Sequence, residues 1–216
     1  MLTRVHCRGF SLVELMAALA SGLFILAGVG LVYAEVVRAN AAVLKTAHLQ
    51  QTLWSLMTTM ADDLRRAGYW SRAELVLDGT AVNGFAPLHV AGDGGCILYS
   101  YDEDKDDVDG APDPADQHGF RLVDGRLQIK TSDAVCGAST CSDCASGTWW
   151  LLTDPQAIRI RALAFTAAER AEPLPGGAQQ LVAREIAIAL EGELAADAAV
   201  RHRLTTRVSV RNHAVR

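Results

Sequence analysis

The first third of the chain carries two helical patterns in succession. Residues 15–34 form a run of twenty uncharged, mostly apolar residues. At about 1.5 Å per residue, a helix of that length reaches about 30 Å, the thickness of a bilayer's hydrocarbon core. Further on, apolar residues recur every three or four positions, as in a helix with one buried stripe. This stripe consists of Leu49, Leu53, Leu56, Met57, Met60 and Leu64.

No proline interrupts residues 10–67, and Gly68 is a natural C-terminal stop for a helix. The sequence therefore predicts one continuous helix of nearly 60 residues, about 85 Å long. We expect its first half to lie in an apolar phase and its second half to pack on the domain that follows.

From Ala73 onward the hydrophobic period falls to two and turn residues become frequent, which predicts β-strands. Asp124-Gly125 separates two short alternating runs and predicts a two-residue hairpin. Residues 169–180, with two prolines and two glycines, are interpreted as a loop. Because strands follow the helix instead of alternating with helices, the fold class is α+β, with a long helix on a mainly antiparallel sheet. The expected strands are Phe85–Val90, Cys96–Tyr101, Gly119–Val123, Arg126–Thr131, Thr148–Leu152, Ile158–Phe165, Val182–Leu190 and Leu204–Arg211.

The string Arg8-Gly-Phe-Ser-Leu-Val-Glu-Leu15 leads into the apolar run. Arg4 and Arg8 favour a cytoplasmic location for the N-terminal side. Glu14 places a carboxylate at the head of the run, where an ionisable group is costly and has a functional reason by default. A secretory signal cleaved after Ala20 fits poorly, since Glu14 would lie inside its core and apolar residues continue past the cleavage site. A lipoprotein signal through Cys7 fails because His6 precedes it.

This arrangement resembles the N-terminus of type IV prepilins. The resemblance implies that a prepilin peptidase cuts between Gly9 and Phe10 and methylates the new N-terminal Phe10. It also implies that Glu14 pairs with the N-terminal amine of a neighbouring subunit. The expected fold is then pilin-like, in four segments: a cleaved leader (1–9), the transmembrane or filament-core half of the helix (10–34), its amphipathic half (35–68) and a periplasmic β-rich domain (69–216).

Three later stretches resemble more particular families. Met60–Tyr69 resembles the helix end of PilW-type minor pilins, and Tyr99–Asp104 resembles their mid-domain strand and acidic turn. Thr206–Asn212 resembles the closing strand that they share with J-type minor pseudopilins. These resemblances imply a PilW-like minor pilin that helps to start type IV pilus assembly near the tip. The alternative, a J-type pseudopilin of type II secretion, is not separated from it by the sequence.

The resemblance also implies partners and location. The partners would be the prepilin peptidase, the other minor pilins, the major pilin and the inner-membrane assembly platform. Before assembly the chain would lie in the inner membrane as a single-pass protein with its C-terminal domain in the periplasm. After assembly it would be part of the cell-surface pilus.

Five cysteines are present, and Cys7 would be lost with the leader. The remaining even number, in a domain placed outside the cytoplasm, favours two disulfides, although three pairings are open. The spacing of the last three also matches plant-type iron–sulfur ligands. A membrane-anchored periplasmic metal or redox protein is therefore the alternative from another class. The four candidates are Cys96, Cys136, Cys141 and Cys144.

An acidic stretch follows the second expected strand and is close to the opening of a calcium loop, because alternate aspartates can converge on one ion. The stretch departs from the EF-hand pattern, since Asp107 stands where the turn glycine belongs and Asp113 where the last glutamate belongs. A solvated acidic loop is the default interpretation, and Ca²⁺ is the cofactor that the pattern leaves open. The candidate ligands are Asp102, Asp104, Asp106 and Asp109.

Charge and motifs limit the remaining function classes. The net charge is −5, and without residues 1–9 it is −7, from 18 basic and 25 acidic residues. An acidic domain with three lysines is a poor polyanion binder, so no nucleic acid is expected as a partner of the monomer. Phosphate-loop, serine-hydrolase and zinc-protease motifs are missing, and each histidine outside the leader is interpreted as a surface residue. We expect a structural protein without enzymatic activity.

Overall fold

The computed structural model describes residues 11–105, 107, 109–130, 143–174 and 179–215. The chain divides into two compact units, Met1–Lys45 and Thr46–Arg216, which are treated separately here. One helix, α1 (Leu12–Leu64, 53 residues), begins in the first unit and ends in the second. The predicted continuous helix is confirmed, with both ends a few residues inside the expected bounds.

In the first unit, the apolar side chains of α1 are exposed. Leu12, Phe24 and Leu31 are between 74% and 83% exposed, and other large apolar residues of this stretch are similar. α1 is long and apolar enough to cross a membrane, with a mean hydropathy of 2.3 in its most apolar window. None of that window is buried within the part of the chain that the structure describes. An apolar surface of this size requires cover from lipid or from other subunits.

In the second unit, the C-terminal part of α1 supplies a face of the hydrophobic core. The whole predicted stripe is buried, together with Ala61: Leu49, Leu53, Leu56, Met57, Met60 and Leu64. This face packs with residues of both sheets, for example Phe120 and Ile188. The helical period alone therefore identified the buried side of this segment correctly.

The first sheet has five antiparallel strands in the order β1-β2-β3-β4-β5. Asp124 and Gly125 join β3 to β4 with φ values of +51° and +75°, as a type I′ hairpin requires, and the predicted turn is confirmed. The bounds are β1 (Leu88–Val90), β2 (Cys96–Ser100), β3 (Gln117–Val123), β4 (Arg126–Lys130) and β5 (Trp149–Leu151).

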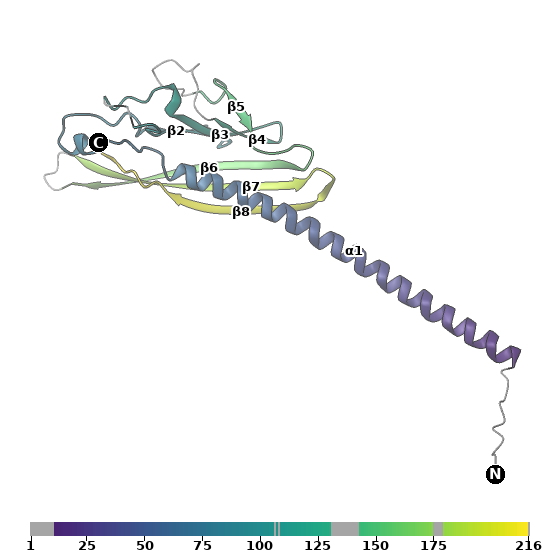
Figure 1. The fold of residues 1–216 in the computed structure, drawn as a ribbon. Helices are drawn as coiled ribbons and strands as arrows, with labels where there is room; N and C mark the ends of the chain where they lie inside the picture. The colour runs from purple at the N-terminus through teal and green to yellow at the C-terminus, as the bar shows by residue number, and fades with distance from the viewer. Residues whose placement is uncertain (1–10, 106, 108, 131–142, 175–178, 216) are drawn as a thin grey trace, which may run out of the picture. The chain divides into compact units, whose positions relative to one another are not determined.

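The second sheet is also antiparallel and contains β6 (Ile158–Pro173), β7 (Gln180–Leu194) and β8 (Asp197–Ser209), while the short β9 (Ala214–Val215) pairs with β7. Figure 1 shows the two sheets as separate layers. The sequence did not indicate this division into two sheets, because strand alternation identifies a buried face but not the strand that pairs with it.

β6 and β7 extend beyond their expected bounds, whereas β8 begins earlier than expected and ends two residues before Arg211. β6 and β7 stay paired out to Pro173 and Gln180, so the interpretation of 169–180 as a loop was wrong for residues 169–173 and 180. The reason is that β6 is exposed on both faces from Thr166 onward. A strand segment without a buried face carries no hydrophobic alternation, and here backbone pairing with β7 alone defines it.

Two short elements complete the second unit. α2 (Glu74–Leu77) is a single turn after α1, and η1 (Pro114–Asp116) is a 3₁₀ turn directly before β3. The Asp113 side chain caps η1 by accepting a hydrogen bond from the Ala115 N–H at 2.6 Å. The Asp116 carboxylate in turn accepts a hydrogen bond from the Asp113 N–H at 3.0 Å. This reciprocal cap fixes Asp116 at the base of the acidic loop.

Candidate functional site

The N-terminal turn of α1 presents Glu14 to the surroundings. The carbonyl of Ser11 accepts hydrogen bonds from the N–H groups of Glu14 and Leu15 at 3.0 and 3.1 Å, which starts the helix. Glu14 is exposed and lies in the first turn, where the helix dipole favours a carboxylate. Gly9 and Phe10 lie outside the described residues, so cleavage and methylation there stay predictions.

The C-terminal end of α1 is fastened to the first sheet by one carboxylate. Asp63 accepts hydrogen bonds from the hydroxyls of Tyr99 and Tyr101, the second at 3.1 Å. Arg66 lies 3.8 Å from the same carboxylate and 4.0 Å above the ring of Tyr101. Burial, followed by the charge of Asp63, raises the pKa of both tyrosines above the ordinary value. Both hydroxyls therefore stay protonated and donate to Asp63 at neutral pH.

His118 lies in the same region and is buried, so its interpretation as a surface residue was wrong. Its ring stacks on Tyr101 with centroids 3.9 Å apart, and its Nε2 lies 3.9 Å from the Glu103 carboxylate. Burial lowers the pKa of His118 from 6.5 to about 4. The imidazole is thus a neutral packing element at physiological pH, and no nucleophile accompanies it among its described contacts.

The segment that follows β8 contacts the same end of α1. Asn212 donates from Nδ2 to the carbonyls of Arg66 and Ala67 at 3.0 and 3.2 Å, and the Arg211 N–H donates to the Arg65 carbonyl at 3.3 Å. These bonds satisfy carbonyls that the end of a helix leaves without partners. The three stretches singled out in the sequence, Met60–Tyr69, Tyr99–Asp104 and Thr206–Asn212, therefore meet at one place.

The loop between β2 and β3 gathers four carboxylates, which we name the acidic cluster: Asp102, Asp104, Asp107 and Asp116. One oxygen from each residue lies within 4.8 Å of an oxygen from every other. Burial, followed by a hydrogen bond with Asp116 and the surrounding carboxylates, raises the pKa of Asp107 to about 8. The structure thus brings together two of the predicted calcium ligands, Asp102 and Asp104.

Of the other two predicted calcium ligands, the structure describes only Asp109. Asp109 is outside the acidic cluster, and its Oδ1 accepts a hydrogen bond from the Ala111 N–H at 3.1 Å. Asp106 lies outside the described residues. In their place the cluster contains Asp107 and Asp116, which the spacing of the aspartates did not single out.

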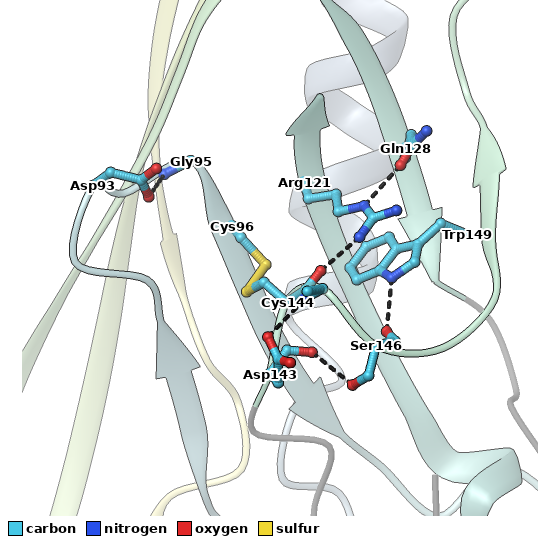
Figure 2. The surroundings of a disulfide bond; sticks show 10 residues. Asp93, Gly95, Cys96, Arg121, Gln128, Asp143, Cys144, Ser146 and Trp149 are labelled. Atoms are coloured by element: carbon cyan, nitrogen blue, oxygen red, sulfur yellow. Dashed lines mark hydrogen bonds between the residues drawn. A yellow bond between two sulfur atoms is a disulfide. The ribbon is translucent and has the colours of Figure 1, made fainter. Parts of the chain in front are cut away.

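A disulfide joins Cys96, at the start of β2, to Cys144, in the loop before β5 (Figure 2). The two Cα atoms are 6.3 Å apart, within the usual range for a disulfide. This bond agrees with the disulfide interpretation, in which Cys96 and Cys144 are not available as thiolate ligands. Cys136 and Cys141 lie outside the described residues, so a second disulfide between them stays a prediction.

The chain around Cys144 is held by further contacts, which Figure 2 shows. Arg121 donates from Nη1 to the Cys144 carbonyl at 2.6 Å and from Nε to Gln128 Oε1 at 2.7 Å. Its guanidinium lies 4.3 Å from the ring centroid of Trp149, whose Nε1 donates to the Ser146 carbonyl at 2.9 Å. Trp149 is thus partly covered, whereas the neighbouring Trp150 is 61% exposed.

Replacing Cys96 and Cys144 together with serine is expected to lower the free energy of unfolding by about 2–4 kcal/mol. The disulfide closes a segment with a sequence separation of 48, and a crosslink over that length removes much entropy from the unfolded chain. Urea unfolding of the full chain in mild detergent, followed by tryptophan fluorescence, measures the loss.

The matched control replaces Cys136 and Cys141 with serine. If these two form the second disulfide, they close a much shorter segment, so the expected loss is smaller. An equal or greater loss from the control pair, or non-reducing peptide mapping that links Cys96 to another cysteine, would contradict the assignment.

Several of these residues could not have been found from the sequence. Asp63, His118 and Asn212 act through contacts between segments far apart in the chain. The stretches Met60–Tyr69 and Thr206–Asn212 were singled out by resemblance, but no local pattern indicated these contacts. Asp116 had one usable signal, the Asp-Pro-Ala-Asp string at 113–116, which is typical of a capped turn.

Comparison with known proteins gives two matches. The family model described as prepilin peptidase-dependent protein B matches residues 42–210. Prepilin peptidase-dependent protein B of Escherichia coli (strain K12) is 28% identical over 155 residues, which cover 71% of this chain and 74% of the relative. No solved structure matches. Because the family match begins at residue 42, the N-terminal motif is an independent observation.

Proposed function

The chain belongs to the family of prepilin peptidase-dependent protein B, and on that premise we propose that it is a minor pilin that a prepilin peptidase processes before assembly. The name of the E. coli relative states a dependence on prepilin peptidase. In this chain the Gly9–Phe10 motif supplies the matching cleavage site, and Phe10 is the residue that would be methylated. The pilin-like combination of one long apolar helix and antiparallel sheets accords with this assignment.

The single observation that carries the proposal is the position of Glu14 in α1. It is a carboxylate at the head of a long helix whose most apolar window is not buried among the described residues. In a filament such helices cover one another, and the apolar surroundings make an isolated carboxylate costly. An N-terminal amine on a neighbouring subunit supplies the opposite charge, so Glu14 sets the register between subunits.

We further propose the PilW-like assignment, with a position near the pilus tip and a part in starting assembly. Its partners are the other minor pilins, the major pilin and the inner-membrane assembly platform. The helix-end stretch, the mid-domain strand and the closing strand support this assignment, because the residues that resemble PilW-type pilins meet at one junction. The chain starts as a single-pass inner-membrane protein with a periplasmic domain and has no enzymatic role of its own.

Deleting the gene for this chain in its native cells is expected to reduce surface filaments strongly while export of folded enzymes continues. Electron microscopy and the pilin content of sheared material measure the surface filaments. The activity of exported enzymes in the culture medium measures export. Restoring the wild-type gene is the control. Normal filaments with blocked export would instead assign the chain to type II secretion as a J-type pseudopilin.

A membrane-anchored metal or redox protein is the second candidate class, and the cysteines were its main support. The disulfide between Cys96 and Cys144 weakens it, since two of its four ligands are oxidised in the structure. Bound iron or zinc in the purified chain, together with four titratable thiols, would restore this candidate.

A further inference from the structure

We propose that the loop between β2 and β3 binds one Ca²⁺ ion through the acidic cluster, that is, through the carboxylates of Asp102, Asp104, Asp107 and Asp116. The role of the ion is to fasten this loop to the segment that follows α1. The inference does not depend on the pilin assignment, because it rests on the geometry of the loop alone.

The first observation is an unpartnered oxygen on a buried carboxylate. Asp102 is 1% exposed, and its Oδ2 accepts a hydrogen bond from the Ser71 N–H at 2.9 Å. Its Oδ1 is buried and has no hydrogen-bond partner among the described residues. A buried carboxylate oxygen without a donor or a counterion is costly, and a bound cation would supply the missing charge.

The second observation is the balance of charge. Asp116 is also 1% exposed, and its two oxygens accept hydrogen bonds from the N–H groups of Glu103 and Asp113, both at 3.0 Å. Each of these oxygens keeps a second lone pair for a metal. Among the described residues, no lysine or arginine forms an ion pair with Asp102, Asp107 or Asp116.

The third observation concerns the kind of ion. All four ligands are carboxylate oxygens, which suit hard cations and not zinc or copper. The ligand oxygens lie within 4.8 Å of one another. Oxygens on opposite sides of Ca²⁺ are about 4.6–5.2 Å apart, whereas around Mg²⁺ they are about 4.1 Å apart. Separations of up to 4.8 Å leave room for Ca²⁺, and the comparison of CaCl₂ with MgCl₂ distinguishes the two ions.

The loop is already connected to the chain after α1, which indicates what the ion would do. The Asp102 N–H donates to the Tyr69 carbonyl at 2.9 Å, and Trp70 Nε1 donates to the Asp107 carbonyl at 2.7 Å. With the bond from Ser71, three successive residues contact two members of the acidic cluster. An ion that holds the cluster therefore stiffens the connection between the helix end and the first sheet.

Calcium titration of the full chain in non-ionic detergent, after dialysis against EDTA, tests the proposal. Isothermal titration calorimetry with CaCl₂ is expected to show one site, and the melting temperature is expected to rise in CaCl₂. Asp104→Asn, at an exposed position where folding is not at risk, should weaken binding about tenfold or more through loss of a charged ligand. Asp116→Asn should do the same.

Asp109→Asn is the matched control, because Asp109 lies in the same loop but outside the acidic cluster. It should bind Ca²⁺ as the wild type does. Asp107→Asn gives an independent readout: because it loses one carboxylate ligand of the acidic cluster, CaCl₂ should raise its melting temperature less than that of the wild type.

Three outcomes would overturn the proposal. One is the absence of binding heat and of any melting shift in the wild type. Another is equal Ca²⁺ affinity in Asp104→Asn, Asp116→Asn and the Asp109→Asn control. The third is stabilisation by MgCl₂ equal to that by CaCl₂, which would remove the assignment to calcium.

Discussion

Glu14→Ala is expected to leave cleavage of the leader intact while removing the protein from assembled filaments. Glu14 lies in the first exposed turn of α1, beyond the predicted cleavage bond. In the proposed pairing within the filament core, its loss would leave the amine of a neighbouring subunit without a counter-charge. Breaking a buried ion pair costs about 3–5 kcal/mol, so incorporation should fall roughly a hundredfold or more.

Immunoblots of whole cells and of sheared filaments measure the two effects separately. Cell-associated Glu14→Ala protein should migrate as the processed form, and the sheared fraction should lack it. Glu35→Ala is the matched control, because Glu35 is an exposed glutamate of the same helix, and it lies 3.7 Å from the Arg38 guanidinium. Normal amounts of Glu14→Ala protein in the filaments would rule out the assigned role of Glu14.

Asp63→Ala is expected to lower the free energy of unfolding by about 2–4 kcal/mol. The substitution leaves the hydroxyls of Tyr99 and Tyr101 without their acceptor. A buried polar group that loses its partner costs about 1–3 kcal/mol, and two tyrosines lose theirs here. Because Asp63 lies on α1 and the tyrosines on and after β2, the helix end should also lose its hold on the first sheet.

Asp62→Ala supplies the comparison at the adjacent position. Asp62 is exposed and pairs with Arg65 on the surface of the same helix, so its removal should cost less than about 1 kcal/mol. Urea unfolding of the full chain in detergent, with hydrogen exchange of the α1 end, measures both variants. Equal stability losses in the two variants would show that Asp63 does not fasten the helix.

The helix and most strands could be predicted because their signals are local. Six positions of a 3.6-residue period identified the buried face of α1, and two residues, Asp124 and Gly125, identified a hairpin. Strand segments that lack such local signals were not predicted. The outer half of β6 has no buried residue from Thr166 onward, so its last residues were interpreted as a loop although they pair with β7.

The acidic cluster shows why site residues are harder to predict than elements. Alternate aspartates converge on one ion only if the loop keeps one regular conformation. Lys105 adopts a φ of +67°, which turns the backbone and changes the set of carboxylates that meet. Asp116 comes from a capped turn before β3, and its approach to Asp102 depends on the pairing of β2 with β3.

Mass spectrometry of the N-terminus of the protein from its native cells tests the central claim most directly. The account predicts a chain that begins at methylated Phe10, as prepilin processing requires. A chain that still begins at Met1, or that begins at Ser21 after an ordinary signal cleavage, would contradict it. In that case the disulfide and the acidic cluster would become the leading guides to function.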